Sequence, residues 1–138
     1  MNPTRYAACN YKRLLPLIDG MNDADSHRRF ESSGFMPLVV ELIGSDRHGF
    51  PVFSLAHYGE QNGDLMCDPD MTLAVNFDAG EVEPLTFQND YMGIYQTVYK
   101  HDSAGRLLYS RRLRSELDDF LRQWLANIKE QGFIPERR

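Results

Sequence analysis

The chain has 138 residues, of which 42% are hydrophobic and 25% charged, and its formal net charge is −5. This length suits one domain, and the aromatic content of 12% suits a folded core, so the composition argues against global disorder. No run approaches the roughly 20 apolar residues that span a bilayer, and the first residues lack the apolar stretch of a secretion signal. Cys9 and Cys67 form neither a disulfide framework nor a four-ligand zinc pattern. We therefore expect a cytoplasmic protein whose single domain spans residues 1–138.

The charge is distributed unevenly along the chain. Residues 1–47 carry six basic and six acidic side chains, and residues 100–138 carry nine basic and six acidic ones. The stretch 48–99 has no Lys or Arg, and its eight acids are Glu60, Asp64, Asp68, Asp70, Asp78, Glu81, Glu83 and Asp90. The middle of the chain therefore predicts an acidic surface.

The N-terminal part predicts a short helix followed by a connector. Apolar side chains within Thr4–Leu15 favour a helix, which we expect Pro16 to end because proline removes a backbone donor. Residues 19–26 lack apolar periodicity and are rich in the turn formers Gly, Asn and Asp, so they predict a polar connector.

Alternating and β-branched segments in the centre predict strands. These strands fall at residues 36–43, 50–57, 71–77, 81–87 and 92–100. Pro84 argues against a central position for its strand, since it cannot donate to a ladder. The polar stretch Ala56–Asp70 predicts a long acidic loop between two of the strands. Short turns elsewhere favour an antiparallel meander over βαβ units.

The C-terminal part predicts an amphipathic helix. Seven apolar side chains recur at helical spacing: Leu113, Leu117, Phe120, Leu121, Trp124, Leu125 and Ile128. Ser110 or Ser115 can cap its start, and Gly132 supplies a left-handed stop. Such a helix needs an apolar surface to cover. The expected fold class is therefore α+β: an antiparallel β-meander of about 4–5 strands, packed by a C-terminal amphipathic helix and a short N-terminal helix.

The stretch Ala56–Asp70 holds the densest group of chemically versatile side chains. Imidazole and carboxylates are ordinary ligands of Zn, Mn or Fe, although the spacing here matches no metal motif and no calcium loop. If a metal binds, its candidate ligands are His57, Asp64, Asp68 and Asp70. We otherwise expect no cofactor. Cys67 lies among carboxylates, which raise the pKa of a thiol and so argue against a nucleophile.

Neither a hydrolase elbow nor a glycine-rich phosphate loop occurs in the sequence. Phosphate binding needs clustered cations, and these occur only at Arg28-Arg29 and in a second cluster of Arg106, Arg111, Arg112 and Arg114. The second cluster equally suits neutralisation of the domain's own acidic middle. We therefore disfavour direct nucleic-acid binding.

Three strings carry a family resemblance: SLAHYGEQNGDLMCDPDM (Ser54–Met71), QNDYMGIYQTVY (Gln88–Tyr99) and FLRQWLANIKEQGF (Phe120–Phe133). Together they resemble a bacterial domain family of unknown function, over most of residues 34–134. The closing FLxxWLxxIxxQGF pattern and NYKRLLP (Asn10–Pro16) also resemble a second family of small proteobacterial proteins. The resemblance implies a cytoplasmic accessory protein, often encoded in phage, plasmid or integrative-element contexts. It brings no assigned activity, so no catalytic residue is carried over.

We expect a non-catalytic module that binds another protein through an acidic recognition surface. Its candidate residues are Tyr58, Glu60, Asp64, Asp68, Asp70 and Tyr91. Two alternatives stay open. One is a metal-binding or hydrolytic enzyme that uses His57, Asp64, Asp68 and Asp70. The other is an acidic nucleic-acid mimic that inhibits a nucleic-acid-binding protein. Membrane binding is not expected.

Overall fold

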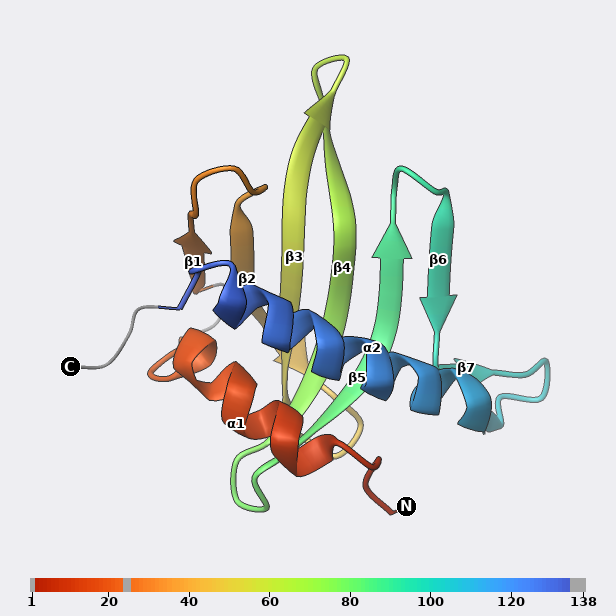
Figure 1. Ribbon diagram of the computed structural model, residues 1–138. Helices are drawn as coiled ribbons and strands as arrows, with labels where there is room; N and C mark the ends of the chain where they lie inside the picture. The colour runs from red at the N-terminus through yellow and green to blue at the C-terminus, as the bar shows by residue number, and fades with distance from the viewer. Residues whose placement is uncertain (1, 24–25, 135–138) are drawn as a thin grey trace.

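The computed structural model describes residues 2–23 and 26–134 (Figure 1). Two helices enclose the strands in chain order. The elements are α1 (Ala7–Ile18), β1 (His27–Phe30), β2 (Leu38–Ser45), β3 (Pro51–Gln61), β4 (Asp64–Asn76), β5 (Glu81–Asn89), β6 (Ile94–Thr97), β7 (Tyr99–His101), β8 (Leu107–Tyr109) and α2 (Arg111–Glu130). Neither helix has the length and apolar composition that crossing a bilayer requires.

The strands form a six-stranded antiparallel sheet in the order β1-β2-β3-β4-β5-β6, beside a two-stranded sheet of β7 and β8. Each strand of the large sheet pairs with the next one in the sequence, so the predicted meander and the α+β class are confirmed. The sheet has more strands than the four or five expected, since β1 was not predicted. Both helices lie on the same face of the sheet, with α2 crossing the strands (Figure 1).

β3 and β4 form one long hairpin, so the prediction of a long acidic loop over Ala56–Asp70 is wrong. Their pairing runs from Val52–Ala74 to Gln61–Asp64, and only two residues connect them. Asn62 has φ 53° and Gly63 has φ 84°, the pair of positive angles that a tight hairpin turn requires. The paired segment 58–67, here called the hairpin arm, extends past both helices (Figure 1).

The N-terminal helix is shifted relative to its predicted range. It starts at Ala7 and contains Pro16, which lies in its last turn rather than ending it. The helix continues past the proline because later residues still find acceptors, as when the Asp19 N–H donates to the Leu15 carbonyl at 2.9 Å. β5 lies between β4 and β6, so the expectation that Pro84 keeps its strand out of a central position is wrong. Pro84 is tolerated because it lies in the part of β5 that pairs with β4 but not with β6.

The core lies between the sheet and the two helices. Fully buried side chains include Phe53, Leu55, Met71 and Leu73 of the sheet, Leu14 and Leu17 of α1, and Leu121, Leu125 and Ile128 of α2. The apolar stripe of α2 thus packs against the sheet as predicted, except for Phe120, which is exposed. Its cap is Ser110, whose hydroxyl accepts a hydrogen bond from the Leu113 N–H at 3.2 Å. Gly132, just beyond the helix, has φ 86°.

A buried carboxylate ties the two helices together. Asp118 of α2 accepts hydrogen bonds from the Thr4 hydroxyl (2.7 Å), the Tyr6 N–H (2.9 Å) and the Asn10 side-chain amide (3.3 Å). Tyr6 is the N-cap residue of α1, and its own side chain makes no capping bond. Asp118 therefore supplies, from another helix, the negative group that a helix N-terminus favours.

Candidate functional site

The hairpin divides the predicted site residues between the two faces of the sheet. His57 points toward the helices. Its ring centroid lies 5.7 Å from that of Trp124 and 5.3 Å from that of Phe133. Asp70 pairs with Ala56, the residue before His57, and accepts a hydrogen bond from Ser54 at 2.8 Å on the opposite face. The four candidate metal ligands therefore do not share one face.

A bulge explains why Asp68 and Asp70 face opposite ways. The register of β3 and β4 shifts between Ala56, which pairs with Asp70, and Tyr58, which pairs with Cys67. In a regular strand residues 68 and 70 would share a face, but the extra residue changes the alternation. Asp68 is thereby placed with His57 on the lining of one cavity.

His57 is held in one protonation form. Its Nδ1 lies 3.0 Å from the Met36 carbonyl oxygen, which can only accept, so Nδ1 carries the proton. Burial lowers the pKa of His57, and this effect exceeds the opposing influence of the Met36 and Pro37 carbonyls and of Asp68. The ring is therefore neutral at pH 7.

Asp68 and His57 line a cavity of about 220 Å³, here called the His57 cavity. Apolar side chains form much of its wall: Phe35, Met36, Pro69 and Trp124. The amides of Asn127 and Gln131 complete the lining from the end of α2 and the residue after it. Asp68 is oriented by Asn89, whose side-chain amide donates to Asp68 Oδ1 at 2.6 Å.

A second group of acids lies on the face of the sheet away from the helices. Asp70 accepts hydrogen bonds from Ser54 and from the Tyr58 hydroxyl. Burial raises the pKa of Asp70, and the carboxylates of Glu41 and Asp90 raise it further. Burial, followed by the negative charge of Asp70, also raises the pKa of Tyr58 to about 12. We call Glu41, Tyr58, Asp70 and Asp90 the outer acidic face.

Cys67 is buried beside this face. Its N–H donates to Asp90 Oδ2 at 2.9 Å, and the Asp90 N–H donates back to the Cys67 carbonyl at 3.0 Å. Burial, followed by the hydrogen bond to Asp90 and its charge, raises the pKa of the Cys67 thiol to about 11. The expected effect of neighbouring carboxylates is confirmed, although burial is the larger cause.

The remaining candidates lie on or near the hairpin arm. Asp64 starts β4 opposite Gln61, and Glu60 pairs with Leu65; both acids are exposed. Tyr91 follows β5, and its hydroxyl packs against Gly59. A Cβ added to Gly59 would lie only 2.7 Å from the Tyr91 hydroxyl oxygen. Across residues 2–23 and 26–134, no three His, Cys, Asp or Glu side chains come together in a group that could hold a metal ion.

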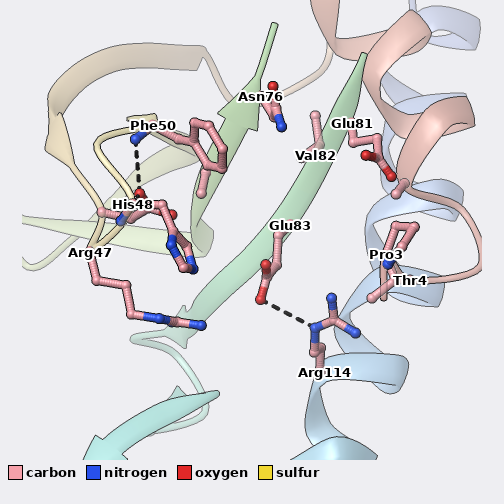
Figure 2. Close-up of a pocket in the computed structure, with 13 residues that line it drawn as sticks. Pro3, Thr4, Arg47, His48, Phe50, Asn76, Glu81, Val82, Glu83 and Arg114 are labelled. Atoms are coloured by element: carbon pink, nitrogen blue, oxygen red, sulfur yellow. Dashed lines mark hydrogen bonds and ion pairs between the residues drawn. The ribbon is translucent and has the colours of Figure 1, made fainter. Parts of the chain in front are cut away.

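A further cavity, of about 150 Å³, combines residues that no sequence pattern had linked (Figure 2). Arg114, at the start of α2, lies 3.2 Å from the carboxylate of Glu83 on β5, and both side chains are largely buried. The Tyr99 hydroxyl also donates to Glu83, and the Arg47 guanidinium lies 4.3 Å from the Tyr99 ring centroid. The interpretation that the basic cluster neutralises the acidic middle of the chain is confirmed for Arg114.

These features define an α+β protein in which an antiparallel meander carries two helices on one face and acidic side chains on the other. The chain belongs to the family "Domain of unknown function (DUF6908)", whose model matches residues 9–134. The resemblance carried by the three sequence strings is thereby confirmed. No curated protein and no solved structure matches the chain significantly.

Proposed function

We propose that the protein is a non-catalytic binding module whose outer acidic face recognises a basic segment of another protein. The observation that carries the proposal is a group of carboxylates without a counter-charge. Glu41 and Asp90 both raise the pKa of Asp70, yet none of the three carboxylates forms an ion pair with a basic group in the described segments.

The negative charges of Glu41 and Asp90 near Asp70 make this face receptive to a cation. The raised pKa of Asp70 means that its ionised form is disfavoured where it stands. A lysine or arginine of a partner would offset these charges, whereas an acidic partner would add to them. Complementary charge of this kind speeds association and selects the partner.

Aromatic and amide side chains extend the acidic face across the sheet. Asp70 of β4 pairs with Gln88 of β5, which in turn pairs with Tyr95 of β6. Directly paired residues project from the same face, so Tyr95 lies on the same face as Asp70. Tyr95 is 66% exposed, and tyrosine is enriched at protein interfaces.

A lysine octamer labelled with a dye provides the first test, and a glutamate octamer of opposite charge is the control ligand. The double variant Glu41→Gln/Asp70→Asn removes two charges from the face. The matched control Glu116→Gln/Asp119→Asn removes two charges from exposed positions on α2. We expect fluorescence anisotropy to show binding of the lysine octamer that weakens about tenfold or more in the first variant and less than twofold in the control. Equal weakening in both variants, or none in either, would refute the proposal.

The alternative of a metal-binding or hydrolytic enzyme is supported only by the shared cavity of His57 and Asp68, because Asp64 and Asp70 lie elsewhere. The alternative of nucleic-acid mimicry predicts that the basic partner itself binds nucleic acid. The family resemblance adds to our proposal an accessory role in the cytoplasm, in the context of mobile genetic elements.

A further inference from the structure

We infer that the His57 cavity binds an alkylammonium group, the chemical group at the end of a lysine side chain. This site is separate from the outer acidic face, because His57 and Asp68 lie on the helix side of the sheet and Asp70 on the other. The inference does not rest on the proposed function.

The charge of the cavity selects a cation. Among its eight lining residues Asp68 alone is acidic and none is Lys or Arg. His57 adds no positive charge at pH 7, since burial lowers its pKa and its Nδ1 proton is donated to the Met36 carbonyl. The site therefore carries one negative charge, which repels anions.

Asp68 retains an oxygen for a ligand. Its Oδ1 accepts from Asn89, whereas no hydrogen bond within residues 2–23 and 26–134 uses its Oδ2. Asp68 and His57 together give a metal ion too few ligands, and no three-residue metal group occurs among the described residues. One free carboxylate oxygen is well suited to an ammonium donor, because charge-assisted hydrogen bonds are the strong ones.

The walls suit the carbon chain of such a ligand. Phe35, Pro69 and Trp124 line the cavity with apolar surface, and Trp124 is fixed by ring contacts with His57 and Phe120. An aromatic ring near a cation adds electrostatic attraction, and a lysine stem packs along apolar surface while its charged end is satisfied. The volume of about 220 Å³ lies below the roughly 300–1,000 Å³ of pockets for drug-sized ligands, so it fits a side chain better than a large cofactor.

The only tryptophan of the chain, Trp124, reports directly on this site. We would titrate the protein with N-acetyl-lysine amide and follow tryptophan emission, using N-acetyl-norleucine amide as the neutral analogue without the ammonium group. Binding at the outer acidic face leaves this signal unchanged, so the experiment separates the two proposals. We expect a saturable change with the lysine derivative and at least tenfold weaker binding of the norleucine derivative.

Two variants locate the charge that is responsible. Asp68→Asn keeps an acceptor for Asn89 but removes the negative charge, and we expect it to weaken binding of the lysine derivative about tenfold. Asp64→Asn, at the exposed start of β4, makes the same chemical change and should leave affinity within twofold. The inference is overturned if the lysine derivative gives no saturable signal, if the norleucine derivative binds equally well, or if Asp68→Asn has no greater effect than Asp64→Asn. The comparison of the two ligands on the unaltered protein needs no variant and so does not depend on variant folding.

Discussion

Replacing the buried Asp118 with alanine should destabilise the fold more than any other single change of an acid in α2. The carboxylate accepts three hydrogen bonds, from Thr4, the Tyr6 N–H and Asn10. In Asp118→Ala the Thr4 hydroxyl and the N–H of Tyr6, the N-cap residue of α1, lose this acceptor. The fully buried Asn10 amide loses its bond to the carboxylate and keeps only the one to the Asp118 backbone carbonyl at 3.2 Å. At about 1 kcal/mol or slightly more for each lost bond, we expect a loss of about 3–4 kcal/mol in the free energy of unfolding.

The neighbouring Asp119 provides the control. Its side chain is 64% exposed and lies 3.6 Å from Arg122, the geometry of a weak surface ion pair. Asp119→Ala should therefore cost about 0.5 kcal/mol or less. Urea denaturation followed by Trp124 emission measures both variants, with the slope of the transition checked for constancy. A cost below about 1 kcal/mol for Asp118→Ala, or one equal to that of Asp119→Ala, would refute the role assigned to this carboxylate.

Three further predictions concern single side chains. Burial and like charge raise the pKa of Asp70 in the folded protein, so Asp70→Asn should be more stable than the parent in urea denaturation at pH 7. This difference in stability should vanish below the unfolded-state pKa of about 4, where both states are protonated. A difference that grows toward low pH would contradict this sign. A thiol with a pKa of about 11 is about one part in a thousand thiolate at pH 8. The buried Cys67 should therefore react with a disulfide dye at least ten times more slowly than the half-buried Cys9. Variants that keep only one of the two cysteines measure each rate separately. Ser110→Ala should lower the unfolding free energy by about 1 kcal/mol because it removes the cap of α2, whereas thermal or urea unfolding of Ser115→Ala should match the parent.

The parts of the fold that were predictable depend on local sequence information. The apolar stripe of α2 repeats within one helix, so its buried members followed from spacing alone. Phe120, at the edge of the stripe, is still 39% exposed while its ring contacts Phe87 at 5.1 Å between centroids. The order of the sheet was equally accessible, because each strand pairs with its neighbour in sequence.

The hairpin arm was missed although its turn signal was present. Asn62-Gly63 is the dipeptide that favours a two-residue hairpin turn, but the acids around it were interpreted as a solvated loop. A strand pair that extends past the helices has solvent-accessible surface on both faces, so charged residues such as Asp64 are tolerated there. Polarity therefore gave the wrong secondary structure at this position.

The arrangement of the candidate sites was not accessible from the sequence. A bulge reverses the alternation between Asp68 and Asp70, and nothing in the local pattern fixes where a bulge falls. The meeting of His57 with Trp124 joins a strand to the last helix, which depends on tertiary packing. Conversely, the burial of Asp118 contradicts the usual expectation for an acid and becomes understandable only when α1 is placed beside it.

The hairpin arm has a consequence for how members of this family can diverge. Its turn at Asn62-Gly63 lies beyond both helices, so its backbone is not constrained by the core (Figure 1). Paired residues added after Gln61 and before Asp64 would lengthen the arm by about 3.4 Å for each added pair, without moving any helix contact. Relatives can therefore differ in reach and in tip sequence while they keep the same core, and the tip is the natural place to insert an epitope or a label.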